Sequence, residues 1–309
     1  MARGARRPPA RAVPGHAAAE AISQTLRGAR TRAAAAGVDR REIEARTPDP
    51  TADHFETETG FIIRGARIAA AAINPRHNSG FDLLKNPDDP RGEAVRITPG
   101  APAFSVVIVL EDERSVALAA LRGYLGHVQF DEEGAVNVSY VPSSNSRRFP
   151  AYEARRAEID RLRALVAVAV QRSTFRVRSE QEAIRLADRI RVEKALDPTL
   201  GVYAAYAFAQ AGIDSQVRDV LAYMRDDLDA DLFDVAMLAN EMRRSPRHRH
   251  LAPMCPMLTQ GWNLLRAYDV KLPGVLEDAS RFLCDSLWST FTSRGTRLIV
   301  DAVTAGDLE

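Results

Sequence analysis

Cysteine and long apolar runs are scarce in this chain, which argues against a disulfide-rich protein and against a membrane-spanning one. Two cysteines, Cys255 and Cys284, are too few for a disulfide framework, so free thiols in a reducing compartment are expected. No apolar run approaches the ~20 residues that a membrane-spanning helix needs. The arginine-containing first residues lack the apolar stretch of a secretory signal. The sequence therefore predicts a soluble, cytoplasmic protein without a membrane partner.

The chain also lacks an excess of charge of either sign. The formal net charge is +1, so the molecule as a whole is not built to bind polyanions. Lysine is found at three positions, Lys85, Lys194 and Lys271, and arginine supplies the remaining positive charge. A length of 309 residues and a hydrophobic content of 46% predict about two domains with substantial cores.

Motifs of nucleotide-binding and hydrolytic sites are missing. The sequence contains neither G-x-x-x-x-G-K-[ST] nor G-x-G-x-x-G, and neither G-x-S-x-G nor H-E-x-x-H. The acidic run Asp226–Asp231 lacks the glycine and the terminal glutamate of a calcium-binding EF-hand loop. We expect this run to cap a helix that begins near Leu232. No cofactor is predicted.

Residues 1–52 differ in composition from the rest of the chain. They are rich in arginine, alanine and proline and contain no aromatic residue. Their apolar content is too low for a core, so a mostly disordered basic arm is expected. Basic side chains attract the phosphates of nucleic acids, so nucleic-acid binding through residues 1–46 remains an alternative.

Residues 54–145 show the period-two alternation of short strands. Asp131–Gly134 is typical of a hairpin turn, 74–90 is expected to be a long loop, and 142–150 a polar hinge. The spacing predicts a small antiparallel β-sandwich or barrel. The expected strands are 55–64, 93–97, 104–110, 115–118, 126–130 and 135–141.

Residues 151–309 are predicted to form an α-helical module. The clearest helix begins at Pro198, after Asp197 as N-cap, and ends before Gly212. It is apolar or small on all faces, which predicts a central helix covered by neighbours. The sequence as a whole predicts an α+β fold, a β module followed by a helical stack. The other expected helices are 152–171, 179–196, 214–228 and 232–244, with two more after residue 251.

A metal site is one interpretation of His248, His250 and Cys255, because imidazole and thiolate are good ligands for zinc. The three residues lack the usual ligand spacing, and a fourth ligand would have to come from elsewhere. The alternative is a solvated basic loop that leads to a buried thiol.

A catalytic pair of Cys255 or Cys284 with a histidine is a second possibility. No local signature of a caspase or of a papain-like protease accompanies either cysteine. Cys284 lies at helical spacing among apolar neighbours, which favours packing. The candidate histidines are His54, His77 and His127.

Several segments of the sequence follow one another in a characteristic order. This order resembles the region C-terminal to caspase-like or trypsin-like peptidase domains in large bacterial proteins of defence or conflict systems. The resemblance covers about residues 54–309. The segments are Phe55–Ala66, Asn137–Pro142, Leu162–Ala167, Lys194–Ala207, Leu258–Trp262 and Ser286–Phe291.

The peptidase domain itself has no counterpart here, so the resemblance carries over no catalytic residue. It implies an accessory module that docks a peptidase, its target or a sensor. We therefore expect a non-enzymatic, protein-binding adaptor, with Trp262 and Trp288 as candidate partner anchors or, alternatively, core residues. The competing hypotheses are a hydrolase with a Cys/His pair and a nucleic-acid binder that uses the basic arm.

Overall fold

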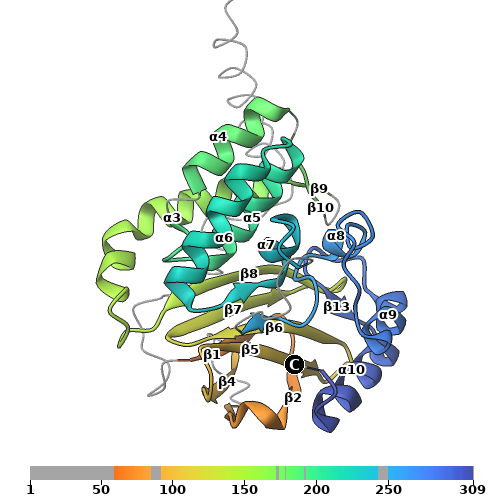
Figure 1. Ribbon diagram of the computed structural model, residues 1–309. Helices are drawn as coiled ribbons and strands as arrows, with labels where there is room; N and C mark the ends of the chain where they lie inside the picture. Colours follow the sequence, from red (N-terminus) through yellow and green to blue (C-terminus); the bar gives the residue numbers. More distant parts are fainter. Residues whose placement is uncertain are drawn as a thin grey trace, which may run out of the picture. The chain divides into compact units, whose positions relative to one another are not determined.

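The computed structural model describes residues 59–84, 92–171, 174–177, 179–190, 193–242 and 250–308. The predicted basic arm, residues 1–52, lies outside these ranges, as do His54 and His248. Residues 50–309 form one compact unit, which is of the mixed α/β kind (Figure 1). Among the residues that the structure describes, the sheets do not close into a barrel.

The first sheet has five strands in the order β3-β4-β1-β7-β8. Most neighbours are antiparallel, as predicted, but β1 pairs with β7 in parallel. Strands of both sheets lie between β1 and β7 in the sequence, so this parallel pair joins distant segments of the chain. The bounds are β1 Gly60–Arg64, β3 Gly80–Leu84, β4 Glu93–Thr98, β7 Tyr124–Phe130 and β8 Ala135–Pro142.

The second sheet has four antiparallel strands in the order β13-β6-β5-β2. Its edge strand β13 comes from the far end of the sequence. The predicted boundary between residues 145 and 151 therefore marks a change of secondary structure inside one compact unit. The bounds are β2 Ile68–Ile73, β5 Ala103–Leu110, β6 Ser115–Leu121 and β13 Thr290–Phe291.

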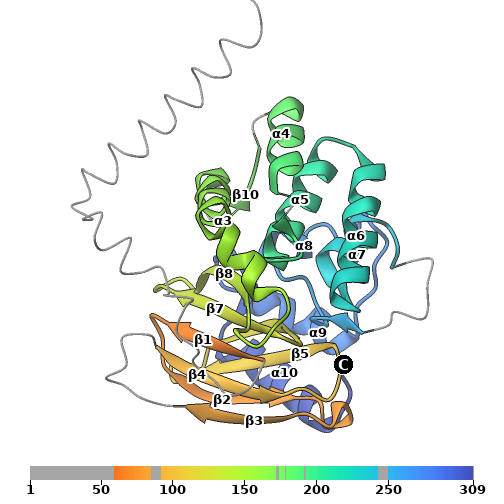
Figure 2. The ribbon, with the colours of Figure 1, turned by 90° about the vertical axis from the view of Figure 1, so that its left-hand side faces the viewer.

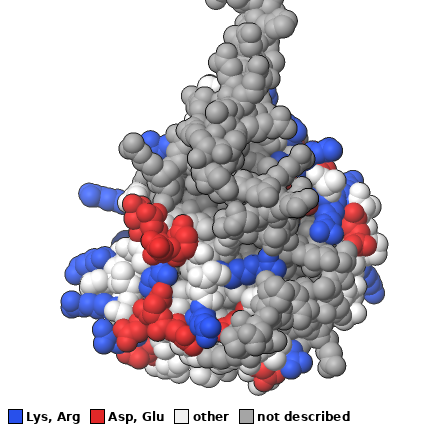
Figure 3. Space-filling view, turned by 180° about the vertical axis from the view of Figure 1, so that it is seen from behind, with Lys and Arg blue, Asp and Glu red and all other residues white. Residues whose placement is uncertain are grey.

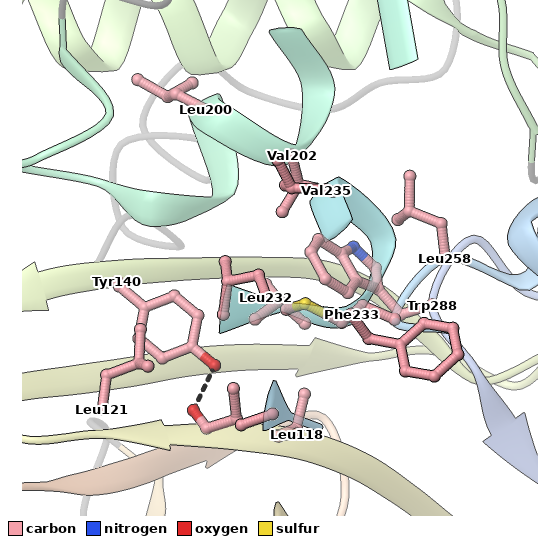
Figure 4. Packing of buried hydrophobic residues seen from close by; sticks show 14 of the residues in the cluster. Leu118, Leu121, Tyr140, Leu200, Val202, Leu232, Phe233, Val235, Leu258 and Trp288 are labelled. Carbon is pink, nitrogen blue, oxygen red and sulfur yellow. Dashed lines mark hydrogen bonds between the residues drawn. The ribbon is translucent and has the colours of Figure 1, made fainter. Parts of the chain in front are cut away.

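The two sheets share one hydrophobic core. Alternate residues of the first sheet, such as Phe61 and Val95, join Val106 and Ile108 of the second in a single buried cluster. This is the period-two pattern that the sequence shows. Tyr140 of β8 also crosses between the sheets, and its hydroxyl donates to the carbonyl oxygen of Ala119 at 2.7 Å (Figure 4).

The opposite face of the second sheet is covered by helices from the end of the chain. Val107 of β5 and Ala117 of β6 pack with Ile299 and Val303 of α10 in a second buried cluster. Helix α10 spans Ser293–Ala305, and α9 spans Gly274–Ala279. Both faces of β5 and β6 are thereby buried, which explains their nearly continuous apolar sequences.

The central helices lie beyond the β8 edge of the first sheet (Figure 2). As predicted, α5 begins after Asp197, whose side chain caps Thr199, and it ends before Gly212 in the left-handed conformation. Almost every side chain of α5 is buried between its neighbours. The bounds are α3 Phe149–Ala169, α4 Glu180–Ile190, α5 Pro198–Gln210, α6 Asp214–Leu228 and α7 Phe233–Leu238.

The structure corrects the sequence-based prediction in several places. The segment 74–90, expected to be a loop, contains the 3-10 helix η1 (Pro75–His77) and strand β3. Asp231 does not cap α7; its carboxylate accepts from Arg225 at 2.6 and 2.9 Å. The chain also forms short elements that were not predicted, namely β9 Val170–Gln171, β10 Thr174–Phe175, β11 Asp231–Leu232, β12 Leu251–Ala252 and η3 Ser280–Phe282.

Candidate functional site

The two tryptophans expected as partner anchors lie at different depths. Trp288 has no exposed surface and packs edge-on against Tyr203 of α5. Figure 4 shows its ring among the labelled apolar residues of the core. It is a core residue in this conformation. Trp262, at the end of α8 (Thr259–Trp262), is half-buried, and its indole N–H donates to the Ser289 hydroxyl at 2.7 Å. Its role as an anchor stays a prediction.

The metal and thiol candidates are placed as follows. His250 is exposed, whereas Cys255 is completely buried in the apolar cluster beneath α10. Within the described residues, no group of three or more histidine, cysteine or acidic side chains is placed to hold a metal ion. Burial raises the pKa of the Cys255 thiol well above its ordinary value, which lowers the fraction of reactive thiolate.

The catalytic-pair candidates within the described residues lie on different elements of the fold. His127 lies on β7 of the five-stranded sheet, and His77 stacks on Phe104 with ring centroids 5.3 Å apart. Cys284 precedes β13 and is half-buried, and burial raises its pKa as well. His54 lies outside the described residues.

A buried ionic network joins the five-stranded sheet to the helices. Asp197 has no exposed side-chain surface, and its carboxylate accepts from the Thr199 hydroxyl at 2.7 Å and the Tyr140 N–H at 3.1 Å. Arg163 of α3 donates to the same carboxylate at 2.8 Å and to the Tyr140 carbonyl at 3.1 Å. Arg163 belongs to α3, Tyr140 to β8, and Asp197 and Thr199 to the start of α5. The network therefore fixes how α3 and α5 meet β8.

A second buried carboxylate, Asp234 of α7, holds the C-terminal segment. It accepts from the Tyr206 hydroxyl at 2.6 Å and from the backbone N–H groups of Met257 and Leu258 at 2.6 and 3.2 Å. Burial raises its pKa from 3.8 to about 6, although these hydrogen bonds oppose the rise. The carboxylate is sealed from solvent, which suits a structural tie between α5, α7 and the segment 256–258.

Large apolar side chains are exposed at few described positions. Phe81 is 39% exposed and Leu84 is 36% exposed, and both belong to β3, which is the last strand of the five-stranded sheet within the described residues. Tyr223, on the outer face of α6, is 59% exposed and lies under the Lys194 ammonium group at 4.6 Å. Figure 2 shows β3 at the border of the sheets opposite the central helices.

Charged side chains of both signs lie on β3 and on its neighbour β4. Asp82 of β3 forms a 3.5 Å ion pair with Arg96 of β4 and keeps 71% of its side chain exposed. On the face drawn in Figure 3, basic and acidic groups of the described residues are interspersed. Exposed apolar residues on a strand with one open edge among the described residues are thus the feature that distinguishes this part of the surface.

Strand β3 is a candidate site that the sequence alone does not indicate. The alternation Phe81-Asp82-Leu83, between Gly80 and Leu84, is a period-two signal, but it spans few residues inside a stretch rich in Pro, Gly and Asn. A stretch rich in these three residue types predicts a loop. The signal that could have identified the strand was this short alternation.

Comparisons with protein-family models, with curated proteins and with solved structures found no match. None of the helices in the described ranges is both long and apolar enough to cross a membrane. The candidate site therefore rests on the geometry of this chain alone.

Proposed function

We propose that this chain is a non-enzymatic, protein-binding adaptor of the cytoplasm that docks a bacterial peptidase or another component of a defence system. The observation that carries the proposal is the pair of exposed apolar side chains, Phe81 and Leu84, on a strand with one open edge. Exposed apolar groups beside unpaired backbone groups are a common basis for binding another protein. The link to peptidases comes from the sequence resemblance.

The candidate site has the features of a binding surface. A half-exposed aromatic ring can be buried by a partner, and the mixed charges around it can form the polar rim of an interface. The buried carboxylates of Asp197 and Asp234 are engaged inside the molecule, where they hold the elements together. They support the scaffold on which the exposed edge is presented.

Affinity purification from the native cells tests this function. The tagged full-length chain is compared with a Phe81→Ser/Leu84→Ser variant, with Trp262→Phe, and with Tyr223→Ser, which removes the exposed aromatic residue of α6. We expect quantitative mass spectrometry to show a peptidase or defence protein that is enriched by the wild type and reduced at least tenfold by the β3 variant. Circular dichroism confirms that each variant is folded.

The proposal is wrong if no protein is enriched over a tag-only control, or if all three variants retain every enriched protein. Loss of the enriched protein with Tyr223→Ser or Trp262→Phe alone would keep the adaptor function and move the interface to the helical region.

A further inference from the structure

The backbone of β3 offers a specific set of free hydrogen-bonding groups. On β4, the Ile97 N–H donates to Thr59 at 3.1 Å, on the side of β1. Successive residues of a strand point their backbone groups to opposite edges, so those of Arg96 point toward β3. Asp82 lies opposite Arg96 in the antiparallel ladder and points back toward β4. The N–H and C=O groups of Phe81 and Leu83 therefore point to the open edge.

The side chains of β3 are arranged on two faces. Phe81 and Leu83 lie opposite Ile97 and Val95, whose side chains belong to the core between the sheets. Leu83 packs partly against that core, whereas Phe81 remains exposed at its border. In an extended segment paired with β3, every second side chain would lie on the same face of the sheet as Phe81, and one of them would lie next to the Phe81 ring.

The charge of β3 favours one kind of occupant. If two copies of the chain paired their β3 strands antiparallel over their whole length, Asp82 would face Asp82 of the other copy. Like charges directly opposite each other are destabilising in a sheet. A segment with a lysine or arginine at this position gains an attractive pair instead, because Asp82 is 71% exposed and its ion pair with Arg96 is loose.

We propose that β3 binds an extended segment of a protein partner by strand addition. The segment hydrogen-bonds to the backbone of Phe81 and Leu83, places an apolar side chain against Phe81, and places a basic side chain beside Asp82. This inference rests on the proposed adaptor function and specifies the chemistry of its partner.

Selection of a phage-displayed library of random dodecapeptides on the full-length chain tests the inference. We expect an enriched motif of alternating apolar and polar residues with Lys or Arg at one fixed position. Selection on Asp82→Lys, a change at an exposed side chain, is expected to replace that basic residue by Asp or Glu. Each selected peptide is resynthesised, and its affinity is measured by fluorescence polarisation for both proteins.

Two further variants separate strand addition from general adhesion. Leu83→Pro removes a donor at the open edge without removing a bond to β4, and it should weaken the selected peptide at least tenfold. Tyr223→Ala changes an exposed aromatic residue elsewhere and should leave the affinity within twofold. Thermal unfolding verifies that the variants are folded, and Asp82→Lys carries the test if Leu83→Pro does not fold.

The inference is overturned if no motif is enriched, or if the enriched motif lacks a basic position. It is also overturned if the preferred charge does not change with Asp82→Lys. The two proposals fail separately. A partner from native cells whose binding depends on Tyr223 or Trp262, with no peptide motif on β3, would refute strand addition and leave the adaptor function standing.

Discussion

The contribution of Asp234 to the free energy of unfolding is expected to increase as the pH falls from 7 to 5. Burial raises the pKa of this carboxyl group from 3.8 to about 6, although Tyr206 and two backbone N–H groups donate to it. In the unfolded chain the pKa returns to its ordinary value. Between these two values the folded protein holds a proton that the unfolded chain has released.

The size of the effect follows from linkage. Above pH 6 the group is ionised in both states, and the buried charge lowers the free energy of unfolding. As the pH falls through 6 the folded state takes up a proton and becomes more stable, until the unfolded state is protonated too. A shift of about two pKa units corresponds to about 3 kcal/mol in total, of which about 1 kcal/mol falls between pH 7 and pH 5.

Urea unfolding of the wild type and of Asp234→Asn at pH 7, 6 and 5 measures this contribution. The asparagine side chain does not titrate, so the gain in stability on acidification should be about 1 kcal/mol larger in the wild type. Tyr206→Phe removes a hydrogen bond that lowers the pKa, so the gain should begin at a higher pH. Equal pH dependence in the wild type and both variants would refute the reasoning.

Further predictions concern packing and the buried groups. Arg163→Ala leaves the carboxylate of Asp197 buried without its cation and should lower the free energy of unfolding by about 3 kcal/mol in urea; a change below about 1 kcal/mol would contradict this. Gly126→Ala places a Cβ atom 2.4 Å from the Phe61 ring and should cost about 1–3 kcal/mol in the same assay, whereas an unchanged midpoint would show that the ring moves freely. The buried Cys255 thiol should react with a disulfide reagent at the rate of unfolding, and rapid reaction of the native protein would show that it is accessible.

The sequence predicted best those elements whose ends carry local signals. Helix α5 was recognised because Asp197 and Gly212 mark its ends, and the β7–β8 hairpin because Asp131 and Gly134 form its turn. Strand β2 was missed because its Ile-Ala-Ala-Ala-Ala-Ile sequence has little β-propensity; packing against β5 and α10 makes it a strand. The parallel pairing of β1 with β7 joins distant segments and has no local signal.

The candidate site was harder to predict than the fold. The residues that stand out in the sequence by their chemistry, such as Trp288 and Cys255, lie inside the molecule. Phe81 became a candidate through two properties of the assembled sheet: β3 is the last strand, and the ring stays exposed at its border. The residues around Phe81 predict neither the order of the strands nor the exposure of the ring.

The position of β13 has a consequence for biosynthesis. The N–H of Ala135 donates to the Thr290 hydroxyl, and the Trp288 N–H donates to the Ala135 carbonyl, so the β7–β8 hairpin is held by residues made much later. The first of these bonds joins residues 155 positions apart. At ordinary rates of translation the ribosome needs roughly ten to thirty seconds to make the intervening residues. Throughout that interval the nascent chain carries β6 without its β13 neighbour, so one edge of this strand stays open to other strands until the last part of the chain is made.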